Sequence, residues 1–101
     1  MAKLRIRKSM AAVAIGASAM TMVAAPAMAT TEYVGGGTWE YGVNIFWNWS
    51  NYYHPNNDHR SSVKTSGIVY RSACTSPGNW SHVQTVSAVS GNKAYWNNAC
   101  N

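Results

Sequence analysis

The alternation of side chains along residues 38–49 and 80–89 constrains this sequence most strongly. At the start of the first segment, Trp39, Tyr41 and Val43 fall on one side of an extended chain, and smaller or polar residues fall on the other. A period of two is typical of a half-buried β-strand. Because no helical period appears beyond the N-terminal third of the sequence, we expect an all-β protein.

Turn-forming residues divide the rest of the sequence into short segments. The expected strands cover residues 38–49, 61–71 with an interruption at Gly67, 80–89 and 93–98. The expected turns and loops cover residues 51–58, 76–79 and 90–92. The last three strands predict an antiparallel meander, and the first strand completes a small antiparallel β-sandwich, with an open barrel as the alternative. We expect residues 30–37, which end in three glycines, to be a flexible leading segment.

The first 29 residues have the pattern of a secretory signal peptide. Lys3, Arg5, Arg7 and Lys8 precede an uncharged apolar run from Met10 to Ala25, and small residues follow it. The run is shorter than the ~20 residues that a membrane-spanning helix needs. We expect cleavage after Ala29, with Ala27 as a minor variant, and a mature domain over residues 30–101. An uncleaved membrane anchor or an amphipathic surface helix is the alternative.

Loss of the leader changes the charge of the protein. The full chain has a formal net charge of +5, whereas residues 30–101 have four basic and three acidic residues, a net charge of +1. Few cations remain to neutralise phosphates, which argues against binding to nucleic acid. All five Trp and six Tyr residues follow the leader. We therefore expect a secreted protein with an aromatic and amide-rich surface that is not a stable membrane protein.

Cys74 and Cys100 are the only cysteines, and both follow the leader. An even pair in an exported protein predicts a disulfide, for which the chain-entropy relation gives roughly 3.5 kcal/mol. In a plain meander the two cysteines would lie on either side of the strand at 80–89, with their Cα atoms about 9.6 Å apart. A disulfide needs Cα atoms within roughly 7 Å. Either the sheet curls or the strand order differs from the meander. Free thiols or an intermolecular bridge are the alternatives.

Aromatic residues must supply much of the core, because Leu, Ile and Phe are scarce. Phe46, Trp47 and Trp49 cannot all be buried on one strand, so at least one is expected at the surface or at an interface. The expected core residues are Trp39, Val43, Val63, Val69, Val83, Val86, Tyr95 and Trp96.

The acidic residues are too few for familiar acid–base catalysis. Only Glu40 and Asp58 could form a carboxylate pair. His54, Asp58, His59 and His82 are a weak set of metal ligands because they lack a second spaced cluster. We therefore predict no enzyme activity, no metal and no cofactor.

Two sequence blocks resemble the lactococcin 972 family of bacteriocins. The first, GGGTWEYGV, covers residues 35–43, and the second, SNYYHP, covers residues 50–55 and precedes a His and a short β run at 59–63. The ending KAYW at residues 93–96 is similar to the aromatic C-terminal strand of that family. Both cysteines and residues 71–81 differ from the family pattern.

The resemblance implies a secreted, non-lantibiotic antibacterial protein with a β-sandwich fold, able to form a homodimer. It implies action on the envelope of related Gram-positive bacteria, with the cell-wall precursor lipid II as the candidate target and no membrane pore. The low net charge and the lack of a cationic amphipathic helix agree with this. The ligand-binding residues expected in and beside the two blocks are Trp39, Tyr41, Tyr52, Tyr53, His54 and Arg60. A secreted carbohydrate-binding or adhesin-like module is the alternative, because Trp, Tyr and Asn side chains suit sugars.

Overall fold

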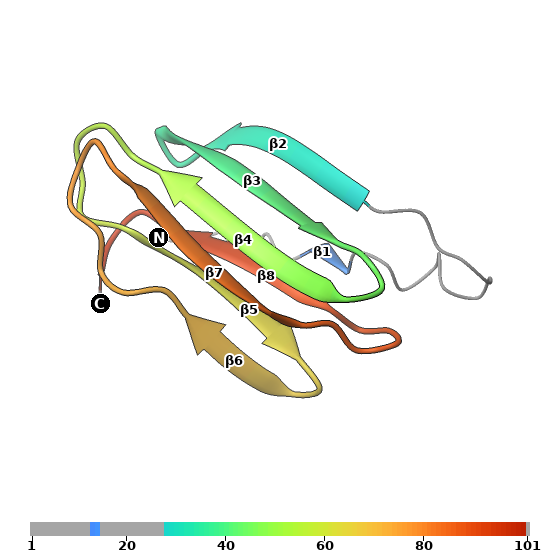
Figure 1. The fold of residues 1–101 in the computed structure, drawn as a ribbon. Helices are drawn as coiled ribbons and strands as arrows, with labels where there is room; N and C mark the ends of the chain where they lie inside the picture. Colours follow the sequence, from blue (N-terminus) through green and yellow to red (C-terminus); the bar gives the residue numbers. More distant parts are fainter. Residues whose placement is uncertain (1–12, 15–27, 101) are drawn as a thin grey trace.

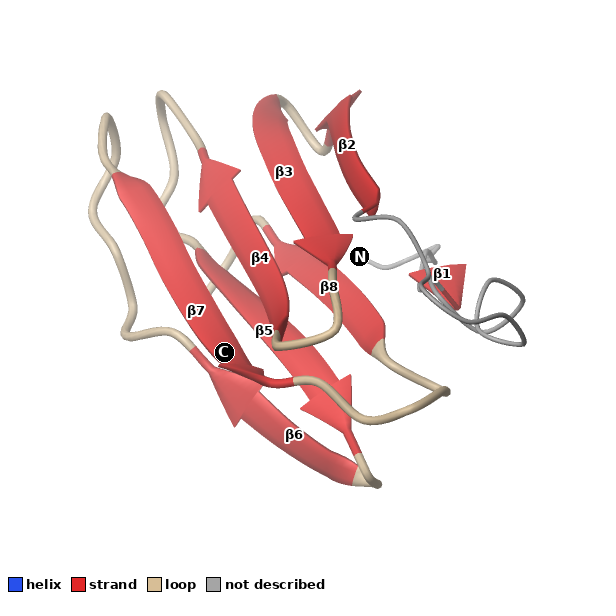
Figure 2. Cartoon of the chain, turned by 45° about the vertical axis from the view of Figure 1, so that its right-hand side comes forward, coloured by secondary structure: helices blue, strands red, loops and turns tan. Residues whose placement is uncertain are grey.

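The computed structural model describes residues 13–14 and 28–100, which form two β-sheets packed face to face (Figures 1 and 2). The strands are β1 (Val13–Ala14), β2 (Met28–Val34), β3 (Gly37–Val43), β4 (Trp47–Tyr53), β5 (Arg60–Thr65), β6 (Ile68–Arg71), β7 (Trp80–Val86) and β8 (Lys93–Asn97). Sheet I has the order β2-β3-β4-β7, and sheet II has the order β1-β8-β5-β6. All paired strands are antiparallel. The small antiparallel β-sandwich predicted from the sequence is confirmed.

The strand order differs from the predicted meander. β7 follows β6 in the chain but pairs with β4 in sheet I, whereas β8 pairs with β5 in sheet II. Residues 87–92 therefore cross between the sheets, and the hairpin predicted at 90–92 between neighbouring strands is wrong. The Asn92 side chain holds this crossing, because its amide bonds the backbone N–H and the carbonyl oxygen of Ala88, each over 2.9 Å.

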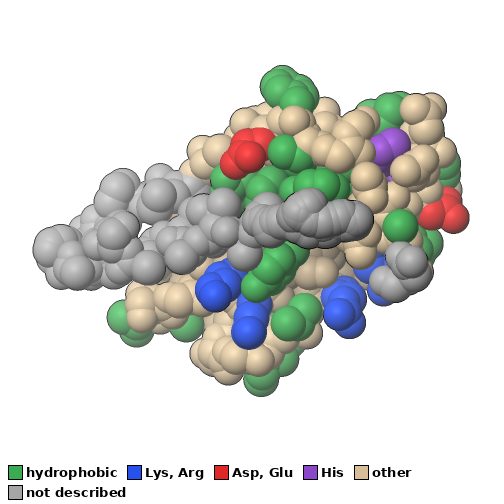
Figure 3. Space-filling view, turned by 180° about the vertical axis from the view of Figure 1, so that it is seen from behind, with side chains coloured by type: hydrophobic (Ala, Val, Ile, Leu, Met, Phe, Trp, Pro, Cys, Tyr) green, Lys and Arg blue, Asp and Glu red, His purple; other side chains and the backbone are tan. Residues whose placement is uncertain are grey.

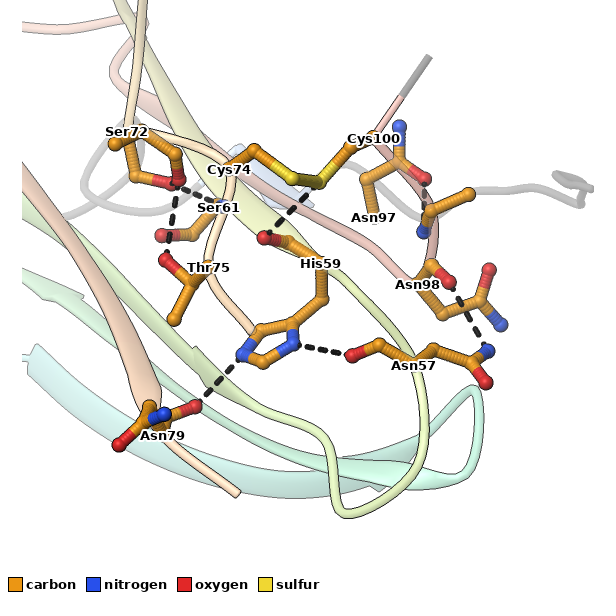
Figure 4. Close-up of a disulfide and its surroundings, with 12 residues drawn as sticks. Asn57, His59, Ser61, Ser72, Cys74, Thr75, Asn79, Asn97, Asn98 and Cys100 are labelled. Atoms are coloured by element: carbon orange, nitrogen blue, oxygen red, sulfur yellow. Dashed lines mark hydrogen bonds between the residues drawn. A yellow bond between two sulfur atoms is a disulfide. The ribbon is translucent and has the colours of Figure 1, made fainter. Parts of the chain in front are cut away.

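The predicted disulfide between Cys74 and Cys100 is confirmed within the chain, with Cα atoms 5.7 Å apart. The crossing of β7 into sheet I removes the strand that would have separated the two cysteines. Thr75 instead lies beside His59, joined by backbone hydrogen bonds of 3.0 and 2.8 Å. Figure 4 shows the bridge next to His59, where Cys100 Sγ lies 3.4 Å from the His59 carbonyl oxygen. This is a contact and not a hydrogen bond, because a disulfide sulfur has no hydrogen to donate.

Residues 30–37 do not form a flexible leading segment, so that prediction is wrong. β2 pairs with β3 along its whole length, and Gly35 and Gly36 form the turn with φ angles of +62° and +85°. Two successive positive φ angles suit a two-residue hairpin, and glycine adopts them without steric cost. A Cβ at Gly35 would collide with the Trp96 ring. The glycines therefore allow close packing of this turn against β8.

A second tight hairpin, at Ser66 and Gly67, divides the strand predicted over residues 61–71 into β5 and β6. The turn restarts the alternation, so Val69 lies opposite Lys64 on the outer side of sheet II and is exposed. Val86 is exposed on the outer side of β7, because β7 buries the other set of alternate residues. Both valines were expected in the core, and both expectations are wrong.

The core between the sheets contains few apolar residues. Those buried are Trp39, Tyr41, Val43, Tyr52, Val63 and Ala94, with Val34, Val83 and Trp96 packed against them. The expected burial of Trp39, Val43 and Val63 is confirmed. Tyr95 was also expected in the core, but it lies half-buried on the outer side of β8, opposite Ser62.

Hydrogen bonds between buried polar groups connect the two sheets. Trp39 Nε1 donates to Ser50 Oγ over 2.8 Å, and Ser50 Oγ donates to the Tyr95 carbonyl oxygen over 2.9 Å. Asn48 Nδ2 donates to Thr65 Oγ1 over 3.0 Å. Because these groups are buried, each bond replaces one that water would otherwise supply. The sandwich is therefore held by directional bonds as well as by apolar contact.

The predicted signal peptide lies largely outside the described residues. β2 begins at Met28, so its pairing with β3 passes through Ala29, after which cleavage is predicted. Across the described ranges, we find no helix with the length and apolar character needed to span a bilayer.

Candidate functional site

The outer side of β4 and β7 is a surface of aromatic and amide side chains. Alternate residues of β4, from Asn48 to Tyr52, are buried against sheet II, so the residues between them face outward. β7 alternates in the same way. The register joins the outward residues in cross-strand pairs, Trp47–Val86, Trp49–Gln84, Asn51–His82 and Tyr53–Trp80. We term these eight residues the aromatic–amide face.

The side chains at one end of this face are in mutual contact. The ring centroids of Tyr53 and Trp80 are 5.6 Å apart, and those of Trp80 and His82 are 6.5 Å apart with 20° between the ring planes. His82 Nδ1 donates to Asn51 Oδ1 over 3.0 Å, because an amide oxygen can only accept. Glu40 on β3 is the register partner of Asn51 on its other side. A carboxylate, an amide and an imidazole therefore form a polar row across three strands.

The aromatic–amide face has the dimensions and chemistry of a carbohydrate-binding surface. Six residue steps along a strand span about 20 Å. Trp47 and Trp80 are 42% and 36% exposed, so both rings are accessible from solvent. Indole rings stack on the apolar faces of sugars, while amides and carboxylates bond sugar hydroxyls. The arrangement can therefore hold an extended, sugar-bearing ligand.

Three of the predicted ligand-binding residues lie inside the sandwich. Trp39, Tyr41 and Tyr52 are only 1%, 3% and 0% exposed. The rings of Trp39 and Tyr41 stack with centroids 3.8 Å apart, and the Tyr52 hydroxyl donates to the Val34 carbonyl oxygen over 2.9 Å. These side chains have no surface for a dissolved ligand, and they stabilise the sheet that presents the face.

His54, another predicted binding residue, is buried in the loop after β4. Its Nδ1 accepts from the backbone N–H groups of Asn56 and Asn57 over 3.1 and 3.0 Å, and its Nε2 donates to the Gly35 carbonyl oxygen over 3.0 Å. This pattern matches a neutral ring with its proton on Nε2. His54 therefore joins its loop to the β2–β3 turn.

Tyr53 and Arg60 are the predicted binding residues that reach solvent, and they lie on opposite sides of the sandwich. Tyr53 belongs to the aromatic–amide face. Arg60 lies half-buried on the outer side of sheet II, opposite Asn97. The predicted set therefore does not form one site. Ligand binding by the six predicted residues stays a prediction. Among them, only Tyr53 and Arg60 have a surface that a ligand could reach.

Sequence reasoning did not select Trp49, Asn51, Trp80 and His82 as site residues. One part of the signal was available, because the alternation of residues 80–89 places Trp80 and His82 on the same side. The expectation that at least one aromatic residue near position 47 reaches the surface is confirmed by the exposure of Trp47. The pairing of β4 with β7 could not be predicted, because another hairpin and the segment before β7 separate the two strands in the chain.

A metal site has no support in the part of the chain that the structure describes. No three His, Cys, Asp or Glu side chains converge there. The ring centroids of His54 and His59 are 6.2 Å apart, but their ring nitrogens contact backbone groups. Beside the disulfide, an open depression of about 480 Å³ is lined mainly by polar residues, including Asn57 and Asn98. Its amides offer hydrogen bonds but no stacking ring.

Comparison with known proteins identifies a related family. A family model described as Bacteriocin (Lactococcin_972) matches residues 35–96. The match begins at the β2–β3 turn, ends within β8, and includes the whole aromatic–amide face. Neither the curated proteins nor the solved structures gave a match to the chain.

Proposed function

The chain belongs to the lactococcin 972 family of bacteriocins, and from this premise we propose that it is secreted and binds a cell-wall precursor such as lipid II. It acts on the envelope of related Gram-positive bacteria by withholding this precursor, without forming a pore. The observation that supports this proposal best is the aromatic–amide face, in which outward rings and amides of β4 and β7 lie in four cross-strand pairs.

The chemistry of a wall precursor suits this face. Its sugar rings offer apolar faces to Trp49 and Trp80, and its hydroxyl and amide groups can bond Asn51, His82 and Glu40. The sheet presents these groups without a rearrangement of the backbone, because β4 is held between β3 and β7. Binding therefore needs little ordering, which favours affinity.

A growth-inhibition assay with the purified secreted protein tests the proposal. We expect inhibition of related Gram-positive strains and protection of those strains by added precursor. The Trp49→Ala/Trp80→Ala variant should need at least tenfold more protein, because an aromatic anchor in a binding surface contributes about 1–2 kcal/mol or more. Tyr33→Ala is the matched control, since Tyr33 is an exposed aromatic residue on β2, outside the aromatic–amide face. Full activity of the double variant, or no protection by precursor, would exclude this proposal.

A carbohydrate-binding or adhesin-like module is the second candidate, because the same face suits wall polysaccharide. It predicts binding to purified polysaccharide with no effect on growth. Inhibition that added precursor reverses, with no retention on the polysaccharide, favours the bacteriocin.

A further inference from the structure

The basic residues of the segment 28–100 all lie on one side of the sandwich. β5, β6 and β8 carry them, and the register directs them all to the outer side of sheet II. We term this set the cationic face, and its members are Arg60, Lys64, Arg71 and Lys93. Figure 3 shows the Lys and Arg side chains gathered on this side, with no Asp or Glu side chain between them.

The acidic residues of this segment lie on other elements, Glu32 on β2, Glu40 on β3 and Asp58 in the loop before β5. The net charge of +1 therefore conceals a strong separation of charge. An approaching anionic surface would be attracted by sheet II alone, because charges beyond about 8–10 Å are largely screened at physiological salt.

Two features of the cationic face leave its charge uncompensated. Lys64 and Lys93 are direct cross-strand partners, and like charges in that position destabilise a sheet. Their carbonyl oxygens both accept from Asn48 Nδ2 over 3.3 Å, so the strands are fixed at this point. In addition, Arg60 Nε is buried without a hydrogen-bond partner among the described residues. An anionic group placed over Lys64 and Lys93 would relieve their repulsion.

Exposed apolar side chains accompany these cations. All of β6 is exposed, including Ile68, Val69 and Tyr70. Of these three, Val69 lies on the same side of the sheet as Lys64 and Arg71, whereas the register directs Ile68 and Tyr70 to the other side. Cations that meet headgroups, beside apolar side chains that enter the headgroup region, are the combination found on proteins that bind at a membrane surface.

We propose that the cationic face docks reversibly on the headgroups of an anionic phospholipid bilayer, with the exposed Val69 of β6 at the boundary. The four cations spread over three strands, which fits a surface better than a single polymer chain. This goes beyond the proposed function, because it assigns a second surface on the opposite side of the sandwich. Docking there leaves the aromatic–amide face uncovered.

Vesicle sedimentation tests this inference, using the protein in the form that the producing cell releases. Vesicles of phosphatidylglycerol and phosphatidylcholine are compared with vesicles of phosphatidylcholine alone. We expect binding to the anionic vesicles that weakens as salt rises. Lys64→Gln/Lys93→Gln should bind roughly 25-fold more weakly, because each cation near such a surface contributes about fivefold. The Tm of this variant should equal or exceed that of the wild type, since the like-charge pair is gone.

A charge-restored variant distinguishes the effect of where the cations lie from the effect of the net charge of the protein. It adds Thr31→Lys and Tyr33→Lys, both on the outer side of β2 in sheet I and outside the aromatic–amide face, to Lys64→Gln/Lys93→Gln. We expect its binding to stay as weak as that of the double variant. Recovery of binding in the charge-restored variant, unchanged binding of the double variant, or binding only to lipid-free cell walls would overturn the inference. Precursor binding is measured separately on the same proteins, so a failure of docking leaves the proposed function standing.

Discussion

The Nε2 atom of the buried His59 ring lies 2.7 Å from the carbonyl oxygen of Asn79, which joins the start of β5 to the turn before β7 (Figure 4). Its Nδ1 lies 2.8 Å from the carbonyl oxygen of Asn57. Carbonyl oxygens only accept, so the ring nitrogen that carries a proton donates to the carbonyl oxygen beside it. Through the contact with Asn79, one side chain connects sheet II to the chain entering sheet I.

Replacement of His59 by Leu should destabilise the protein strongly. The change removes a fully buried ring and the hydrogen bond that it donates to a partly buried carbonyl oxygen, and an unpaired group of this kind costs about 1–3 kcal/mol. We expect the free energy of unfolding in urea to fall by about 2–4 kcal/mol. His82→Leu, an exposed control, should change it by about 0.5 kcal/mol or less. Equal effects of the two substitutions would contradict this role.

Removal of the disulfide by Cys74→Ser/Cys100→Ser should lower the free energy of unfolding by roughly 3.5 kcal/mol, because the unfolded chain regains the entropy of an open loop. Peptide mapping without reductant should show the bridge within one chain. A Tm that reductant does not change would argue against this contribution.

Ser50 should contribute more to the stability of the fold than its small side chain suggests. Ser50→Ala removes the acceptor of Trp39 Nε1 and the donor to the Tyr95 carbonyl oxygen. We expect a loss of about 1–3 kcal/mol in the free energy of unfolding, because both groups are left unpaired between the sheets. Ser90→Ala, in the exposed crossing segment, is the matched control and should be close to neutral. If the two alanine variants unfold at the same urea concentration, the polar connection between the sheets contributes little.

Alkaline pH should unfold the protein through its buried tyrosines. Burial, with the hydrogen bond to Glu32, raises the pKa of Tyr41 to about 12, and burial also raises the pKa of Tyr52 and Tyr95. Tyrosine in an unfolded chain has a pKa of about 10. These groups therefore contribute their full stabilisation below pH 10, and it is lost as the pH rises toward 12 and above.

Circular dichroism and tyrosinate absorbance, followed together from pH 8 to 13, check this prediction. We expect the ionisation of these three residues to coincide with the loss of β structure above about pH 10. Complete ionisation of every tyrosine in a protein that keeps its native spectrum would contradict it.

Local patterns predicted the buried side of β3, because the side-chain alternation reports directly on which side of a strand is buried. Trp39 and Val43 are examples, since their burial follows from alternation alone. The strand bounds were predicted less well, since the strand expected over residues 38–49 is two strands, β3 and β4, and β2 was not expected. Val69 shows the limit of this reasoning, because the tight turn at Ser66 and Gly67 restarts the alternation. The crossing of β7 into sheet I depends on long-range packing, which no local pattern encodes.

The binding residues were harder to predict for a related physical reason. Aromatic residues in this small domain serve both the core and the surface, so residue type alone does not separate Tyr52 from Tyr53. Whether a ring becomes part of a binding surface depends on the neighbouring strand. β7 supplies the partners with which Trp49 and Asn51 form a continuous surface.

The most direct test of the central claim follows the indole N–H signals of the five tryptophans in a proton–nitrogen correlation spectrum. A lipid-free wall precursor, carrying the sugars and the pyrophosphate, is titrated into the protein. We expect saturable shifts of Trp49 and Trp80 on the aromatic–amide face, with the buried Trp39 unchanged as an internal control. Unchanged signals of Trp49 and Trp80, or shifts confined to backbone signals around Lys64 and Lys93, would contradict it.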